Sequence, residues 1–297
     1  MKKINWIVID GKADIKADLI RYIPEKVETE AGYRYVTVHS NQEFENGTIE
    51  FSVKLNHGRG RCQVVLSSTM GVSDLNIGVN VLGSLYGIIR WDTQQRKWEF
   101  INAAGNPDTL NTSQELRIKI TVFGSEIVLY VNEIEILRST VNVRKSQLKL
   151  ALQSEKEILV KNFKVTTIKP KAFIVMQFSD EYNQLYEEVI KPVCESKGIV
   201  CERADEYYTT NMIIDDIIKS IKESSLIIAD ITPDNPNVFY EVGYSHAIDK
   251  PTILLCDKKR SKLPFDLTSF RTLFYENSIA GKTQVEQRLR KYLDNLF

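Results

Sequence analysis

Apolar and polar residues alternate with a period of two through the first half of the chain. Four stretches show this most clearly, at residues 47–55, 116–123, 126–132 and 147–152. Turn-forming pairs such as Asn46-Gly47 and Gly124-Ser125 stand between them. Many short strands with one polar face are typical of a β-sandwich. The pattern therefore predicts an N-terminal all-β sandwich over residues 1–168.

The pattern changes after a short polar hinge at residues 168–171. Apolar, branched runs then alternate with segments that have helical spacing. Strands are expected at residues 172–178, 199–203, 226–229, 251–256 and 270–275, and helices at residues 182–196, 212–223, 238–248 and 283–295. Such alternation predicts a C-terminal α/β domain over residues 169–297, with a doubly wound parallel sheet covered by helices on both faces.

Two carboxylates in this second half are candidates for catalysis. Asp230 ends a buried strand, at the edge of a parallel sheet where ligands bind. Glu241 lies about one turn inside the helix that follows, for which Asn237 is the expected N-cap. We expect the helix dipole to favour the ionised form of Glu241, which suits a nucleophile or charge stabiliser in glycosyl chemistry. The alternative is that Glu241 is an ordinary first-turn acid and Asp230 a turn residue.

Composition and charge narrow the class of protein. The 297 residues carry 39 basic and 39 acidic side chains, so no general attraction to nucleic acid or to an anionic membrane is expected. The four cysteines have no metal-binding spacing, and no apolar run approaches the roughly 18 residues of a membrane span. The apolar run near the N-terminus is too short for a signal peptide. We therefore expect a cytoplasmic protein without a metal site.

Residues 173–275 resemble the nucleoside 2-deoxyribosyltransferase-like family, whose flavodoxin-like fold is related to that of TIR domains. The resemblance is carried by the motifs at residues 228–232 (IADIT), 235–247 (NPNVFYEVGYSHA) and 264–267 (PFDL). It implies that Glu241 is the catalytic glutamate, which attacks or stabilises an anomeric carbon. It also implies that Asp230 lies near the base or ribose.

The same resemblance implies a set of substrate-binding residues. Asn237 would shape the sugar pocket, and Phe178 and Asp205 would line the crevice with it. Gly243 would leave room for the close approach of its helix to a strand or to the ligand, with a simple helix–sheet contact as the alternative.

Two further residues are open to either a binding or a structural role. Tyr207 would stack on a base or cover a loop, and Arg271 would meet a phosphate or pair with Asp266. The loop at residues 177–182 lacks the glycine that transferases of this family often carry. This departure favours hydrolysis of a nucleotide or NAD, or nucleotide binding without turnover. NAD is thus a possible substrate, and no cofactor is expected.

The first half resembles the concanavalin-like jelly rolls of lectins, laminin-G domains and glucanases. The resemblance lies in the alternating strands at residues 44–53, 114–122, 127–132 and 158–165. No glucanase-type array of acids is present on one strand. Trp91, Trp98 and Tyr86 could form a sugar-stacking platform, or could be core aromatics. The basic residues Arg59, Arg61 and Arg90 are weak indications of an acidic partner.

These observations lead to one main hypothesis and two alternatives. The main hypothesis is cleavage or transfer of an N-glycosidic bond in a nucleoside, nucleotide or NAD by the C-terminal domain. The β-sandwich would then sense a glycan or protein ligand or support assembly into a homo-oligomer, as in bacterial defence proteins. The first alternative is a non-catalytic nucleotide-binding signalling module. The second is a carbohydrate-binding protein that acts through the β-sandwich.

Overall fold

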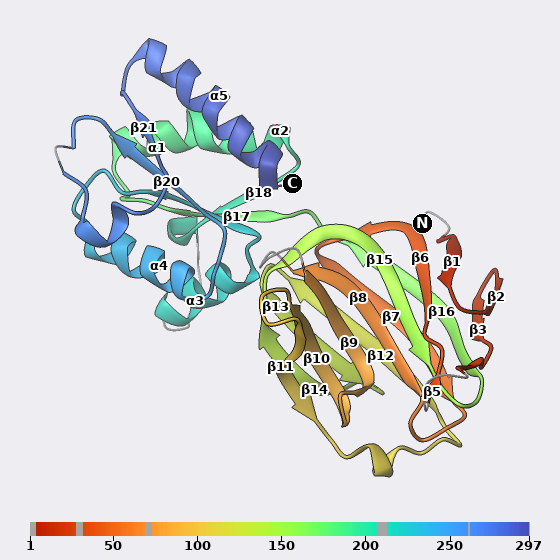
Figure 1. Ribbon diagram of the computed structural model, residues 1–297. Helices are drawn as coiled ribbons and strands as arrows, with labels where there is room; N and C mark the ends of the chain where they lie inside the picture. The colour runs from red at the N-terminus through yellow and green to blue at the C-terminus, as the bar shows by residue number, and fades with distance from the viewer. Residues whose placement is uncertain (1–3, 28–31, 69–72, 207–212, 261, 297) are drawn as a thin grey trace. The chain divides into compact units, whose positions relative to one another are not determined.

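A computed structural model describes residues 4–27, 32–68, 73–206, 213–260 and 262–296 of the chain. The chain divides into two compact units (Figure 1). The first unit comprises Met1–Val122 and Glu126–Ile168, and the second comprises Phe123–Ser125 and Lys169–Phe297.

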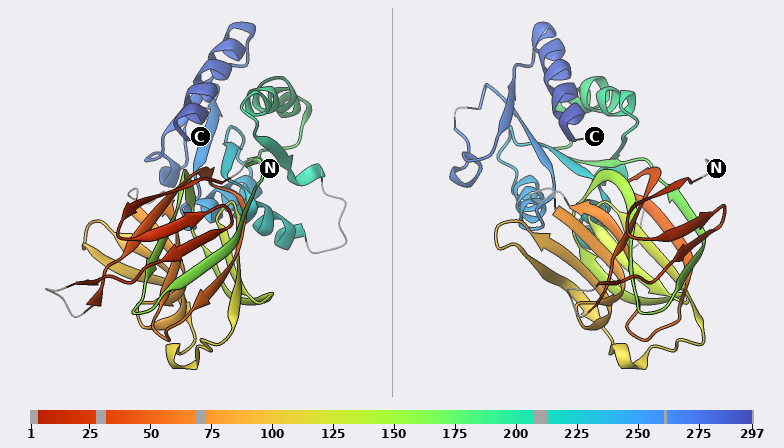
Figure 2. Two further views of the ribbon diagram at one scale, coloured as in Figure 1. Left: turned by 90° about the vertical axis from the view of Figure 1, so that its right-hand side faces the viewer. Right: turned by 45° about the vertical axis from the view of Figure 1, so that its right-hand side comes forward.

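The first unit is a β-sandwich of two seven-stranded antiparallel sheets, which confirms the all-β prediction for this half of the chain (Figures 1 and 2). Sheet A has, in spatial order, the strands β1 (Trp6–Asp10), β6 (Val36–Phe44), β15 (Val143–Gln153), β8 (Arg61–Ser68), β9 (Ser73–Val81), β10 (Ser84–Asp92) and β11 (Lys97–Ala104). Sheet B has the strands β14 (Ile134–Thr140), β13 (Glu126–Val131), β12 (Glu115–Phe123), β7 (Gly47–Leu55), β16 (Ile158–Thr167), β3 (Leu19–Tyr22) and β2 (Ala13–Lys16).

Alternate residues of both sheets form one apolar core. In β7 every second residue is buried, and Ile49, Phe51 and Val53 all belong to the core cluster. The facing strands contribute residues such as Val64 and Ile77 in the same way. Two short strands and a 3-10 turn complete the unit: β4 (Lys26–Val27), β5 (Gly32–Tyr33) and η1 (Pro107–Thr109).

The second unit is built on a five-stranded parallel sheet, as the strand–helix alternation predicted. Its strands lie in the order β18 (Val200–Arg203), β17 (Lys171–Val175), β19 (Leu226–Asp230), β20 (Thr252–Asp257) and β21 (Thr272–Tyr275). All four pairings are parallel. Each residue of β19 is buried, because helices cover both faces of this central strand.

Helices pack on the two faces of the sheet and form two separate apolar clusters. One face carries α1 (Asp180–Leu185), the π-helical turn η2 (Tyr186–Ile190), α2 (Lys191–Ser196) and α5 (Ile279–Leu296). The other face carries α3 (Ile213–Glu223) and α4 (Pro236–Ala247). Figure 1 shows this division, with α5 and α2 on one side of the sheet and α3 and α4 on the other. Short 3-10 turns η3 (Ala204–Glu206) and η4 (Phe265–Leu267) lie in the connections.

The predicted start of one helix needs correction. The helix with the acid begins at Pro236, and its N-cap is Asn235, whose side-chain oxygen accepts a hydrogen bond from the Asn237 amide at 3.0 Å. Asn237 is therefore inside the helix, since Pro236 suits the first helical position and does not delay the start.

None of the described helices is long and apolar enough to span a bilayer.

Candidate functional site

The strand order of the parallel sheet creates a crevice at one end. The chain passes from β17 outward to the edge strand β18 and then returns to β19 on the other side of β17, so the direction of winding reverses there. Open α/β sheets bind ligands at such a reversal, outside the carboxyl ends of the strands. A pocket of about 490 Å³ lies at this place. Its described lining is Met176, Gln177, Phe178, Ala204, Ile214, Ile217, Asn235, Asn237, Val238, Tyr240 and Glu241.

Glu241 is the one acidic side chain in the described lining of this Glu241 pocket. Burial raises the pKa of its carboxyl to about 7. This corrects the expectation that the helix dipole keeps Glu241 ionised. Glu241 lies beyond the first turn of α4, where the dipole has faded, so the cost of desolvation decides the pKa. Both protonation states are therefore populated near neutral pH, as general acid–base catalysis requires.

Phe178 and Asn237 line this pocket together with Glu241, and the substrate-binding and catalytic roles implied for the three stay predictions. Phe178 follows β17 and is half exposed, with 49% of its surface accessible. The guanidinium of Arg203 lies 5.1 Å from the centre of its ring on one side. An aromatic ring held in this way offers a flat apolar surface to a ligand.

Asp205 does not line the pocket; it holds Arg203 in place. The Arg203 guanidinium donates to the Asp205 carboxylate at 2.9 Å and to the Asn183 side-chain oxygen at 3.0 Å. Arg203 is 5% exposed, so its charge needs these partners. Sequence reasoning assigned no role to Arg203, although it stands in the same Arg-Ala-Asp segment as Asp205. The pairing with Phe178 could not be foreseen because the two side chains come from different strands.

Asp230 is also absent from the described lining of the Glu241 pocket. It is 1% exposed and accepts hydrogen bonds from the Tyr275 hydroxyl at 2.6 Å and from the Thr232 amide at 2.8 Å. Thr232 in turn accepts from the Asp257 amide at 2.9 Å. Burial raises the pKa of the Asp230 carboxyl. These contacts tie together the ends of β19, β20 and β21, so they favour a structural role, and a catalytic role for Asp230 stays a prediction.

The loop between β19 and α4 is held by a residue that sequence reasoning missed. Arg260 donates to the carbonyl oxygens of Ile231 and Thr232, both at 2.8 Å, and pairs with Asp234. Its guanidinium also lies 5.8 Å from the centre of the Phe239 ring, inside α4. Arg260 therefore fixes the position from which α4 presents Asn237 and Glu241. Nothing in the sequence marks this contact, since Arg260 is remote along the chain.

The other implied substrate residues fall outside the pocket or outside the described residues. A Cβ atom on Gly243 would meet no atom outside its own helix within 4 Å, so a close contact with a strand at this glycine is wrong, and room for a ligand stays a prediction. Arg271 is exposed and forms no ion pair with Asp266 or with another carboxylate in the part of the chain that the structure describes. Tyr207 lies outside the described residues.

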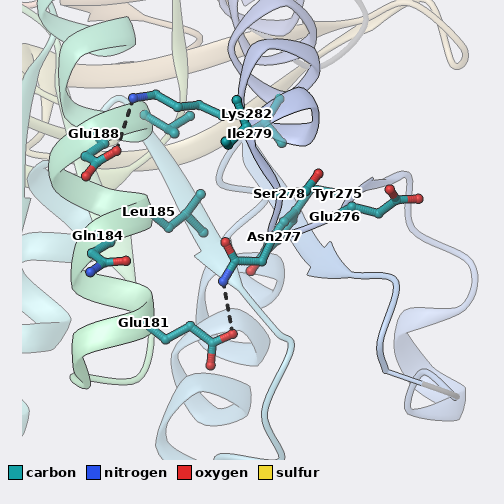
Figure 3. A pocket seen from close by; sticks show the side chains of 12 residues that line it. Glu181, Gln184, Leu185, Glu188, Tyr275, Glu276, Asn277, Ser278, Ile279 and Lys282 are labelled. Atoms are coloured by element: carbon teal, nitrogen blue, oxygen red, sulfur yellow. Dashed lines mark hydrogen bonds and ion pairs between the residues drawn. The ribbon is translucent and has the colours of Figure 1, made fainter.

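A second pocket of about 350 Å³ lies on the opposite face of the parallel sheet, between η2 and the start of α5 (Figure 3). Figure 3 shows Glu181 facing Asn277 and Glu188 facing Lys282 across it. Glu181 also pairs with Lys259, and these contacts hold the pKa of its carboxyl below the ordinary value. The polar groups of this pocket thus already bind one another, which makes it a weaker candidate than the Glu241 pocket.

The β-sandwich has a groove of about 570 Å³ on the face of sheet A that points away from the core. Its described lining is Tyr35, Thr37, His39, Arg61, Gln63, Val65, Asp74, Asn76, Leu82, Ile89, Trp98, Lys149 and Ala151. We call this the sheet A groove. It combines aromatic rings, amides and cations on one surface, as sites for polar small molecules do.

The groove contains part of the predicted aromatic platform. Trp98 lines it and meets Trp91 edge to face, with ring centres 5.4 Å apart. Tyr86 instead packs against the core, so it is not part of the platform. Among the predicted basic residues, Arg61 lines the groove, whereas Arg59 pairs with Asp108 outside it.

Comparison with solved structures finds proteins similar to about half of this chain. A carbohydrate-binding module from Bacillus subtilis is 12% identical with a TM-score of 0.44, and the match covers 55% of this chain and 95% of the module. A prokaryotic lichenase derived from a mouse hindgut metagenome is 8% identical with a TM-score of 0.39, over 56% of this chain and 94% of the enzyme. A Bacillus licheniformis β-glucanase is 10% identical with a TM-score of 0.38, over 57% of this chain and 94% of the enzyme.

No protein-family model matches the chain, and no curated protein matches its sequence. At the TM-scores above, similarity to solved structures assigns neither a family nor a function to this chain.

Proposed function

We propose that the second unit cleaves or transfers the N-glycosidic bond of a nucleoside-type molecule, with Glu241 as the catalytic residue. The observation that carries this proposal is the position of Glu241: a carboxyl with a pKa of about 7 inside a pocket at the winding reversal of the sheet. Perturbed carboxyl groups in clefts are typical of catalytic sites. The proposal also draws on the motif resemblance of residues 173–275.

The pocket offers a surface for each part of such a substrate. The ring of Phe178 and the side chains of Ile214 and Ile217 suit a flat base, and the Asn237 amide suits sugar hydroxyl groups. The bond between C1′ and the base nitrogen breaks, and the base leaves with the electron pair. The ionised Glu241 carboxylate stabilises the positive charge that develops on C1′, or bonds to it. Water or an acceptor base then bonds to C1′, which breaks the bond to Glu241 where one has formed, and the proton that the acceptor loses goes to the base that left.

The test is incubation of the purified protein with deoxynucleosides, nucleotides and NAD, followed by chromatography for free base. Glu241→Gln should reduce release of the base by about 100-fold or more, because it removes the charge that faces C1′. Glu195→Gln is the matched control, since Glu195 is exposed on α2 and remote from the pocket lining. Equal activity of Glu241→Gln and wild type would refute the catalytic role. Absence of product with every substrate would favour a non-catalytic nucleotide-binding module.

A second function is favoured by the sheet A groove: binding of a carbohydrate by the β-sandwich. Trp98 presents a ring to the groove, and the amides of Gln63 and Asn76 line the same groove. Aromatic rings stack on the apolar faces of sugars, while amides bind their hydroxyl groups. A glycan array should show binding that disappears in Trp98→Ala. Binding that persists in this variant, or no binding to any glycan, would exclude the groove as a carbohydrate site.

A further inference from the structure

The sheet A groove is a hollow built into the sheet. Gln63, Val65, Asn76 and Ile89 point away from the sandwich core, and yet each is at most 7% exposed. The strand register places Lys149 opposite Val65, Val65 opposite Asn76, and Asn76 opposite Ile89. These residues therefore form one continuous row across four strands, at about 4.8 Å from each strand to the next. Burial on the outer face of a sheet requires neighbouring side chains that project further than the row itself. The row is therefore the floor of a groove.

The floor holds an amide pair with spare hydrogen-bonding capacity. Asn76 Nδ2 donates to Gln63 Oε1 at 2.8 Å, while Asn76 Oδ1 is buried and has no partner among the described residues. Proteins rarely leave a buried amide oxygen without a donor, because the loss of hydration is not compensated. Sugar hydroxyl groups are donors, so a sugar that reaches the Asn76 amide would supply the hydrogen bond that its oxygen lacks among the described residues.

The side of the groove at Arg61 carries excess positive charge. Arg61 donates to the Tyr35 hydroxyl and lies 5.9 Å from the centre of the Tyr35 ring, and no described carboxylate pairs with it. Lys149 is 3.6 Å from Asp74, the one acid in the described lining. Among the described residues the Arg61 guanidinium is therefore left without a counter-charge, and its planar form binds carboxylates through two hydrogen bonds.

We propose that the sheet A groove binds an acidic saccharide of the uronic acid class; this inference rests on the proposed carbohydrate-binding function. The groove holds an oligosaccharide: one ring stacks on Trp98, hydroxyl groups further along the chain bind the amides of Asn76 and Gln63, and the carboxylate of another sugar residue binds Arg61. An acidic peptide would use the charge of Arg61 but would leave the amide floor and the Trp98 ring without matched partners.

The experiment is calorimetric titration of the full chain with oligogalacturonate and with its methyl ester, which differs in the charged group alone. The acid should bind at least about tenfold more tightly than the ester, and high salt should reduce this difference. Arg61→Gln should abolish the preference for the acid while binding of the ester persists. Arg59→Gln is the matched control and should change neither affinity, because Arg59 pairs with Asp108 outside the groove. Trp98→Ala should weaken both ligands.

The outcomes separate the inference from the function on which it rests. Equal binding of acid and ester would refute the acidic ligand and leave carbohydrate binding intact. Binding of neither would refute the uronic acid ligand, and the glycan array would then decide on carbohydrate binding by itself. If polyglutamate displaces bound oligogalacturonate as effectively as free oligogalacturonate does, the groove is a general surface for acidic peptides. An equal loss of affinity for oligogalacturonate in Arg59→Gln and Arg61→Gln would show that the acid is attracted by surface charge at long range and not bound in the groove. This result would also overturn the proposal.

Discussion

Glu241→Gln should stabilise the second unit at alkaline pH, a prediction that needs no knowledge of the substrate. In the native protein burial raises the pKa of the Glu241 carboxyl from 4.5 to about 7. Between these two values the native state keeps a proton that the unfolded state releases. Stability therefore falls as the pH rises through this window, and the loss is complete above about pH 7. Glutamine has nearly the same shape and carries no charge at any of these pH values.

The difference between 4.5 and about 7 corresponds to ~3 kcal/mol at about 1.36 kcal/mol for each pH unit. Partial exposure of the Glu241 side chain lowers the expected effect to ~1–3 kcal/mol. Glu241→Gln should thus raise the melting temperature by several degrees at about pH 8 and leave it nearly unchanged at about pH 4. A gain in stability with a loss of activity is the usual pattern for a functional residue.

The two units can be followed separately in one experiment. All three tryptophans, Trp6, Trp91 and Trp98, lie in the β-sandwich, so their fluorescence reports on that unit. The α-helices of the described structure all lie in the second unit, so the helical circular dichroism band reports on the other. In Glu241→Gln the rise in melting temperature at about pH 8 should be visible in the helical signal and not in the fluorescence. Glu195→Gln should show no such rise in either signal. An equal gain at both pH values, or a loss at about pH 8, would show that Glu241 is solvated or paired when ionised, and would refute the reasoning.

Three further predictions follow from single contacts. Arg260→Met removes the donors to the two carbonyl groups after β19, so the rate of base release should fall by about tenfold. The circular dichroism spectrum should stay that of the wild type, which would show that the fold is retained. Tyr275→Phe deprives the buried carboxylate of Asp230 of its hydroxyl donor and should cost ~1–3 kcal/mol in urea unfolding of the helical unit; an unchanged midpoint would show that water replaces the hydroxyl. Gly243→Ala should raise the stability of that unit by ~0.5–1 kcal/mol in the same assay, because the added methyl group meets open space on a helix.

The sequence predicted elements best where one face of a strand or helix is buried and the other is not. Strand β7 begins and ends at the predicted residues, because strict alternation registers which side of the strand meets the core. The helix expected at residues 182–196 is in fact divided by the π-helical turn η2, and α5 begins at Ile279 and not at residue 283. Helix starts are set by capping contacts such as that of Asn235, which periodicity does not reveal.

The candidate site was partly predictable. Glu241, Asn237 and Phe178 lie in one pocket because each stands shortly after a strand or in the first half of the helix after it, and parallel strands bring those ends to one edge. Asp230 also ends a strand and still lies outside the pocket, because its carboxylate accepts a hydrogen bond from the Tyr275 hydroxyl of the edge strand β21, on the side away from β17 and β18. Position along a strand does not specify the direction in which a side chain finds its partner.

The order of residues alone thus determined the two-part architecture, since periods of two and 3.6 residues are local properties of the chain. The tertiary structure decided that Glu241 lines the crevice and that Asp205 and Asp230, which the sequence offered equally, do not. The tertiary structure decided the chemistry of that acid, because the pKa of Glu241 depends on how much water its neighbours exclude. It also decided that Arg61 and Asn76 line the same groove, since strand pairing across the sheet is a non-local property that no single stretch of sequence contains.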